Sequence, residues 1–220
     1  MKKILFLLMM PVLCFGQNVN IPDANFKAYL VGNTAINING DGEIQISEAS
    51  VFDVQMNLSN LKISDLTGIE AFTGLTDLWC PTNQLTTLDL TKNIALTHLN
   101  CSENQLSTLD LTKNTALNVF ICRENQISTL DLSNNTALTI LHCDENQISS
   151  LDLSQNTALS ILWCDKNPLR RLDLTKNIAL TRLNCSYNQL TNLDVSNNTA
   201  LSMLNCYKNQ LTRLDLSKNT

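Results

Sequence analysis

Apolar and polar positions along most of this chain follow one pattern, which repeats every 21 residues. In the copy that begins at Leu138 the pattern reads Leu-x-x-Leu-x-Cys-x-x-Asn-x-Ile, and a polar turn ending in Ala158 completes it. Seven cysteines mark the period: Cys80, Cys101, Cys122, Cys143, Cys164, Cys185 and Cys206. Such a period predicts a solenoid, because each turn exposes apolar side chains that only an identical neighbouring turn covers.

The repeat itself predicts the fold class. A period of roughly 20 to 29 residues with regularly spaced leucines and an asparagine is the signature of a leucine-rich repeat. The columns that stay apolar in nearly every turn, and are expected in the core, run through Leu99, Cys101, Leu106, Leu109, Leu111 and Leu117. We therefore expect a leucine-rich-repeat solenoid with a parallel β-sheet on its concave face and a short helical N-terminal cap.

Residues 1–16 have the composition of a removable signal peptide. Lys2 and Lys3 give a basic start, residues 4–13 are apolar, and residues 14–16 fit a cleavage site. This segment predicts an exported protein, either secreted or held at the cell surface.

A membrane anchor is the alternative use of this leader. Its apolar stretch is too short to span a bilayer, and no later stretch approaches that length, so we expect no transmembrane segment. Lipid attachment at Cys14 is disfavoured, because the bulky Leu13 stands where that processing prefers a small residue. Without the leader the chain has 13 basic and 20 acidic residues, a charge of −7, which argues against binding nucleic acid.

Residues 17–57 are expected to form an N-terminal cap. Residues 17–33 predict a short amphipathic helix with Pro22 in its first turn. Phe26, Tyr29 and Leu30 share one face of that helix at spacings of three and four residues. The cap would cover the first turn of the solenoid, whose apolar side would otherwise face water.

The cap also contains a polar loop that resembles the twelve-residue calcium loop of EF-hand and dockerin modules. Gly42 falls where that loop turns sharply, and Ile44 where it packs. The resemblance assigns the ligand positions to Asn37, Asn39, Asp41, Glu43 (backbone carbonyl), Gln45 (through water) and Glu48 (bidentate). Asn37 replaces the usual aspartate, so any Ca²⁺ binding is expected to be weak. The alternative is a plain polar turn followed by a helix that Ser47 caps.

Residues 58–220 hold the repeats. The first is 22 residues long, the others have 21, and the sequence stops partway through a repeat at Thr220. We expect either a truncated gene product or a further C-terminal region. The repeat Leu-x-x-Leu-x-Cys-x-x-Asn-Gln-Leu-x-x-Leu-Asp-Leu resembles that of the cysteine-ladder internalins and related exported bacterial proteins. That resemblance implies adhesion or protein recognition, and no shared catalytic site.

Three invariant columns carry polar or reactive groups, and for each we expect a structural role. The asparagines, such as Asn146, should bond the turn backbone and the next asparagine. The cysteines should be buried free thiols, because stacked side chains about 4.8 Å apart do not suit a disulfide and no zinc-binding spacing is present. The aspartates, such as Asp152, should bond the following turn, with nearby lysines assisting. Bridging of these carboxylates by a cation is the alternative.

The columns that point outward from the strands vary strongly between turns. A strand through Ile140 to Asp144 would bury Leu141 and Cys143 and expose the residues between them. Five neighbouring outward positions are Val119, Ile121, Ile140, Ile161 and Trp163, and their margin holds Arg123, His142, Asp144 and Asp165. An exposed apolar surface of this kind usually marks a binding site.

The sequence therefore favours a non-catalytic module that binds a partner protein on the concave face. The alternatives are a structural spacer in a larger surface protein and a glycan binder that uses Trp79 and Trp163 as stacking platforms. An enzyme is not expected, because His98 and His142 lie two turns apart and no nucleophile, base and orienting group converge.

Overall fold

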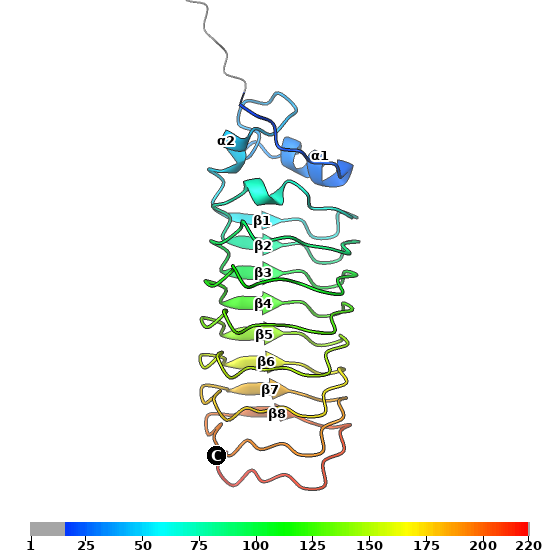
Figure 1. Cartoon of the computed structure of the whole chain (residues 1–220), viewed down its shortest axis with the longest axis vertical. Helices are drawn as coiled ribbons and strands as arrows, with labels where there is room; N and C mark the ends of the chain where they lie inside the picture. Colours follow the sequence, from blue (N-terminus) through cyan, green and yellow to red (C-terminus); the bar gives the residue numbers. More distant parts are fainter. Residues whose placement is uncertain (1–15, 220) are drawn as a thin grey trace, which may run out of the picture.

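A computed structural model describes residues 16–219 of the chain. Figure 1 shows the repeats stacked turn on turn into one solenoid, with the two α-helices packed at its N-terminal end. The signal peptide predicted at residues 1–16 lies almost wholly outside the described residues. Within residues 16–219, none of the helices has the length and apolar character needed to cross a membrane.

One parallel sheet runs the length of the solenoid, with its strands in chain order. Each strand contains three residues: β1 Gln55–Asn57, β2 Asp77–Trp79, β3 His98–Asn100, β4 Val119–Ile121, β5 Ile140–His142, β6 Ile161–Trp163, β7 Arg182–Asn184 and β8 Met203–Asn205. The strands are shorter than the five residues expected from Ile140 to Asp144. Parallel sheets are usually covered on both faces, but here one face packs on the core and the other, the strand face, is only partly covered.

The register of the sheet confirms the repeat lengths. Met56 lies opposite Leu78, an offset of 22 residues, whereas Leu78 lies opposite Leu99 and every later pair is offset by 21. The first strand, β1, lies just before the repeat start inferred at Leu58. The sheet therefore begins inside the segment that the sequence assigned to the cap.

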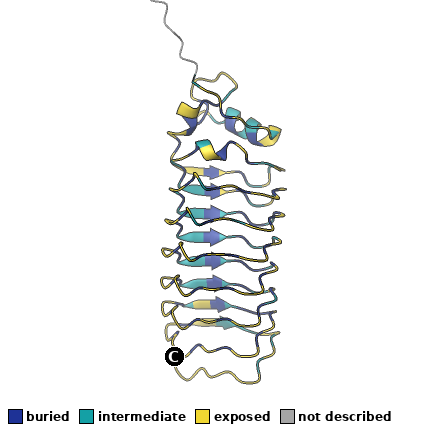
Figure 2. Cartoon of the chain, viewed as in Figure 1, coloured by how far each residue is buried: buried dark blue, intermediate teal, exposed yellow. Residues whose placement is uncertain are grey.

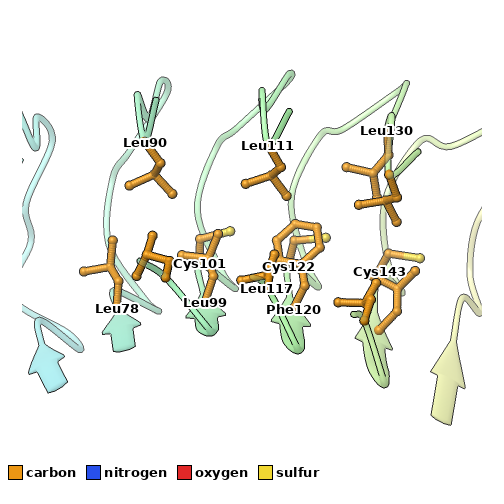
Figure 3. Close-up of a cluster of buried hydrophobic side chains, with 14 of the residues drawn as sticks. Leu78, Leu90, Leu99, Cys101, Leu111, Leu117, Phe120, Cys122, Leu130 and Cys143 are labelled. Carbon is orange, nitrogen blue, oxygen red and sulfur yellow. The ribbon is translucent and has the colours of Figure 1, made fainter. Parts of the chain in front are cut away.

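The core is a continuous apolar column inside the stacked turns, as the dark blue ribbon in Figure 2 shows. Figure 3 shows that successive turns repeat one arrangement of buried side chains: Leu78, Leu99 and Phe120 lie at the strands, Cys101, Cys122 and Cys143 occupy one position in successive turns, and Leu90 and Leu111 lie on the opposite side of the core. Burial of each large apolar side chain contributes about 1.5–3 kcal/mol, so the periodic pattern is itself the main source of stability. Leu109 is the exception among the expected core positions, because it is only partly buried.

The predicted asparagine column bonds to main-chain atoms of two successive turns. Asn104 Nδ2 donates to the carbonyls of Cys80, Cys101 and Ser102 at 3.0–3.1 Å, and its Oδ1 accepts from the Leu85 N–H at 3.0 Å. The prediction that each asparagine bonds to the next asparagine is wrong, because the side-chain amide bonds only to main-chain groups. The column thereby fastens each turn to the preceding one.

A second asparagine column, whose role the sequence reasoning missed, lies deeper in the solenoid. Its members are Asn93, Asn114, Asn135, Asn156, Asn177, Asn198 and Asn219. Asn114 is fully buried, and its Nδ2 donates to the carbonyls of Leu90 and Asn93 at 3.1 and 2.9 Å. Every member of this column is asparagine in the sequence, and this invariance could have indicated a structural role.

The N-terminal cap contains two short α-helices and precedes a 3-10 helix, η1 Ile69–Ala71. Helix α1 spans Ala24–Gly32, shorter than the expected 17–33, because the Asp23 side chain caps it by accepting from the N–H groups of Asn25 and Phe26. Pro22 therefore lies before the helix and not in its first turn. Phe26 and Leu30 are fully buried, as the apolar spacing predicted.

Candidate recognition site

The strand face brings the predicted binding residues onto three neighbouring strands. In the first outward column Val119 lies opposite Ile140, and Ile140 lies opposite Ile161. In the second column Ile121, His142 and Trp163 follow one another on the same strands. All six side chains are half-buried, since each shields its neighbours in the column. The apolar surface is therefore continuous but less exposed than the sequence suggested.

Trp163 and His142 form the centre of this surface. Their rings are stacked, with centroids 4.1 Å apart and planes 5° from parallel. Beside the stack lies a hollow of about 340 Å³, whose wall includes Ile121, Arg123, His142 and Trp163 together with residues of the two preceding turns. An aromatic pair held flat next to a hollow offers a rigid, preformed contact surface.

The charge of the hollow is set by Arg123 and its partners. Arg123 Nη2 lies 2.8 Å from Glu103 Oε1 and 3.7 Å from Glu124 Oε1, so the guanidinium leans toward the preceding turn. Burial, together with the nearby Arg123 charge, lowers the pKa of His142. The imidazole on Trp163 is therefore neutral at physiological pH.

Asp144 does not lie in an exposed margin, as the alternating pattern led us to expect. Its residue is only 7% exposed, and Ser102 and Ser186 in the same column are buried as well. This column follows the strand and is covered by the turns on either side, so a short side chain stays buried while the long Arg123 reaches solvent. Burial and the neighbouring Asp165 charge raise the pKa of Asp144 to about 6.

The cysteine column is a row of thiols, as predicted. The seven cysteines of the described chain are free; six are buried, and Cys206 in the last turn is half-buried. Burial raises the pKa of the Cys101 thiol to about 12 and that of Cys185 to about 12. These thiols are therefore protonated apolar fillers without nucleophilic character.

The aspartate column bonds its own turns. Each member accepts the N–H of the residue two positions later at 2.9 Å; the members are Asp89, Asp110, Asp131, Asp152, Asp173, Asp194 and Asp215. For Asp110, the hydrogen bonds from Thr112 lower the pKa of the carboxyl. The lysines that were expected to assist these aspartates form no ion pairs with them within residues 16–219.

The predicted calcium loop folds with several of its side chains together. Asn39 Nδ2 donates to Asp41 Oδ2 at 3.1 Å and to Gln45 Oε1 at 2.7 Å. Gly42 has a φ of 83°, the left-handed conformation that the sharp turn needs. Asn37 instead bonds the chain locally, donating to the Val31 carbonyl at 3.1 Å.

Glu48 closes the loop through main-chain bonds. Its Oε1 accepts from the N–H groups of Ile38 and Asn39, and its Oε2 accepts from that of Gln45. Gln45 and Glu48 thereby form the capping box of helix α2, Ile46–Ala49, so the alternative cap at Ser47 is wrong. Across residues 16–219 no three His, Cys, Asp or Glu side chains gather as metal ligands. The predicted set relies on three amides, and its calcium binding stays a prediction.

The stacked parallel strands, the two asparagine columns and the buried thiols together define a leucine-rich-repeat solenoid with a cysteine ladder. No protein-family model matches the chain. Internalin J of Listeria monocytogenes serotype 4b (strain F2365) is 40% identical to it over 72 residues, which are 33% of this chain and 8% of internalin J.

Solved structures extend this similarity to nearly the whole chain. The functional domain of InlJ from Listeria monocytogenes, which includes a cysteine ladder, is 34% identical with a TM-score of 0.57, over 93% of this chain and 55% of that domain. Internalin C2 from Listeria monocytogenes strain 4b F2365 shares the fold with a TM-score of 0.78 at 20% identity, over 93% of this chain and 94% of its own. The chain is an internalin-like leucine-rich-repeat protein with a cysteine ladder, and it spans about half the length of the InlJ structure.

Proposed function

We propose that this protein is an exported, non-catalytic recognition module that binds a partner protein through the strand face around Trp163. The similarity to internalins supports a protein-interaction role in general. The strand face is proposed as the binding surface because it is the part of the solenoid where side chains change from turn to turn.

The stack of His142 on Trp163 is the observation that carries the proposal. The core and both asparagine columns use the same residue types in turn after turn, and this pair is not part of them. An aromatic side chain held half-exposed beside a hollow, with Ile140 and Ile161 in the next column, matches the apolar centre of a protein interface. Tryptophan is also among the residues whose loss weakens interfaces most.

The test measures partner affinity in matched tryptophan variants. The immobilised protein is screened for binding to extracellular proteins. For each protein that binds, the affinity is measured with wild type, Trp163→Ala and Trp79→Ala. We expect Trp163→Ala to weaken binding by about 2 kcal/mol or more, roughly thirtyfold. Trp79 lies on β2, four strands from β6, and its variant serves as the control.

The two alternatives predict different results. A spacer predicts that neither tryptophan variant changes affinity for any partner. A glycan binder predicts binding to sugars that depends on both Trp79 and Trp163. Melting temperatures of all variants are compared to show that each remains folded.

A further inference from the structure

Trp79 is an accessible aromatic side chain near the N-terminal end of the strand face. It is 39% exposed, and its neighbours in the same outward column are Asn57 on β1 and Asn100 on β3. Trp163 differs, because it is half-buried, stacked on His142, and its Nε1 is a buried atom. The two tryptophans therefore have different surroundings: Trp163 belongs to an apolar patch, and Trp79 lies between polar side chains.

The two asparagines beside Trp79 are each held by the serine two residues later. Asn57 Oδ1 accepts from the N–H and the hydroxyl of Ser59, at 3.1 and 2.5 Å. Asn100 Oδ1 accepts in the same way from Ser102, at 3.1 and 2.7 Å. These bonds orient both amides but use only the carbonyl oxygens. Neither Nδ2 donates to a partner within residues 16–219, so each retains two N–H donors.

Both of these amide groups are accessible to a ligand. Asn57 is exposed. Asn100 is half-buried, but its Nδ2 keeps contact with solvent. Asn100 also lines the hollow of about 340 Å³, so there is open space next to it. The free donors therefore lie at the surface on both sides of Trp79.

A third asparagine of this column, Asn184 on β7, shows how such an amide is used within the protein. It accepts the N–H of Ser186 at 3.2 Å, but its Nδ2 donates to Asp165 Oδ1 at 2.8 Å. The hydroxyl of Ser186 then has no partner within residues 16–219. Pro81 occupies the place of Asp165 beside Asn100 and offers no acceptor side chain. The amide of Asn100 is therefore left for a ligand.

Asp77 adds an acceptor to the two amides. It lies two residues before Trp79 on β2, and its side chain is 28% exposed. Its Oδ1 lies 3.3 Å from His98 Nδ1, and its Oδ2 has no hydrogen-bond partner within residues 16–219. Trp79 is therefore surrounded by donors on two neighbouring strands and by an acceptor on its own strand.

We propose that Trp79, Asn57, Asn100 and Asp77 bind a pyranose ring of a carbohydrate chain. The apolar C–H face of a pyranose packs on an indole, and its hydroxyls both donate and accept hydrogen bonds. The amides would donate to hydroxyl oxygens, and Asp77 would accept from a hydroxyl. The two asparagines are two strand spacings apart, about 9.6 Å, so they would contact opposite ends of a ring that is linked on both sides.

A proline-rich peptide is the other class of ligand that packs on tryptophan. Such peptides dock in grooves lined by aromatic residues, whereas strands β1 to β3 contain no Phe, Tyr or Trp other than Trp79. A single aromatic side chain among free polar groups fits a sugar better. The carbohydrate site is separate from the surface around Trp163, and it goes beyond the proposed function.

The test follows the indole N–H signals of both tryptophans in a two-dimensional NMR spectrum of the wild-type protein. The signals are assigned with Trp79→Phe and Trp163→Phe. The probes are cellotriose, chitotriose and β-mannotriose at millimolar concentration, and the control is sorbitol, which has hydroxyls but no ring face. We expect at least one trisaccharide to shift the Trp79 signal with at least about tenfold higher affinity than sorbitol, and to leave the Trp163 signal unchanged.

A double variant removes the free donors without disturbing the serine bonds. Asn57→Asp combined with Asn100→Asp keeps the oxygen that each serine contacts and replaces the Nδ2 groups with oxygen. Binding of the trisaccharide should weaken by at least about tenfold, because two hydrogen bonds are lost. Asn134→Asp combined with Asn197→Asp adds the same charge at two exposed asparagines and should leave the affinity unchanged. Melting temperatures show whether both double variants are folded.

Three results would overturn the carbohydrate site. The first is that no trisaccharide shifts the Trp79 signal more than sorbitol does. The second is that a trisaccharide shifts both tryptophan signals equally, which would show binding along the whole strand face. The third is a larger shift of the Trp79 signal with triproline at the same concentration, which would identify a peptide site. In each case the partner assay with Trp163→Ala decides the proposed function separately.

Discussion

The imidazole of His142 lies flat on the indole of Trp163, 4.1 Å from centroid to centroid. The two residues stand opposite each other on β5 and β6. Because the parallel register repeats every 21 residues, the fold places two aromatic residues one repeat apart side by side. Such a pair contributes about 0.5–1.5 kcal/mol beyond the area it buries.

Replacing His142 should loosen Trp163 without unfolding the protein. In a Trp79→Phe background, His142→Ala should lower the free energy of unfolding by about 1 kcal/mol and shift the fluorescence of Trp163 to longer wavelength, because the indole loses its cover. The control is His98→Ala, which removes the histidine on β3. An unchanged emission spectrum in the His142 variant would show that the stack does not hold the indole in place.

Asp144 should make stability depend on pH in an unusual direction. Its folded pKa of about 6 is above the ordinary value of 3.8, so the folded state disfavours the carboxylate. This unfavourable contribution is fully present above pH 6 and disappears as the pH falls toward the unfolded pKa. The charges around it are Asp165 and Glu145, which strengthen the effect, and Arg123, which weakens it.

We therefore expect Asp144→Asn to stabilise the protein at pH 7.5, by about 1–2 kcal/mol. The gain should shrink as the pH is lowered through 6 and vanish near pH 4, as measured by urea denaturation at each pH. Asp152→Asn is the control, since the hydrogen bonds from Ser154 lower the pKa of Asp152. A gain for Asp144→Asn that does not change with pH would contradict a charge effect.

The asparagine that follows each strand should be hard to replace. Asn146 Oδ1 accepts from the Ile127 N–H, and its Nδ2 donates to the carbonyls of Cys122 and Cys143. Asn146→Ala leaves these buried groups without partners, at about 1–3 kcal/mol each, so we expect a loss of about 3 kcal/mol or more in chemical denaturation. Asn134→Ala, which removes one exposed bond to Thr112, should cost less than about 0.5 kcal/mol.

The cysteine ladder should resist alkylation in the native state. Burial raises the pKa of all seven thiols, and only Cys206, in the last described turn, is partly accessible. We expect a maleimide to label Cys206 alone in native protein and all seven cysteines in denaturant, as counted by mass spectrometry. Native disulfides among these cysteines would exclude the thiol ladder.

The loop at residues 37–48 is predicted to bind calcium weakly. In Asn37→Asp a carboxylate replaces the amide that donates to Val31, so the variant should melt at lower temperature than wild type without calcium. With millimolar calcium its melting temperature should rise more than that of wild type, because the first ligand is then charged. Asn134→Asp adds the same charge far from the loop and should show neither effect. Identical melting curves with and without calcium in both proteins would favour the plain polar turn.

The fold of the repeats could be predicted from the amino-acid sequence. The thiol column, the turn bonds of the aspartate column and all the expected core positions except Leu109 were predicted correctly, and the 22-residue first repeat appears in the register of Met56 and Leu78. The reason is physical: a solenoid has only nearest-neighbour contacts, so a strict period in the chain becomes a strict period in space. The outward columns around Trp163 followed from the same alternation.

The contacts of individual side chains within the repeats could not be predicted from the sequence and are seen only in the folded chain. Burial of Asp144, the stack of His142 on Trp163 and the free hydroxyl of Ser186 each depend on what the preceding or following turn places beside the residue. The residue before each asparagine of the first column, such as Glu124 with a φ of 53°, adopts a left-handed backbone without being glycine, which the sequence pattern did not indicate. A repeat pattern places residues in columns, but the energy of a polar group is set by its particular neighbours across turns.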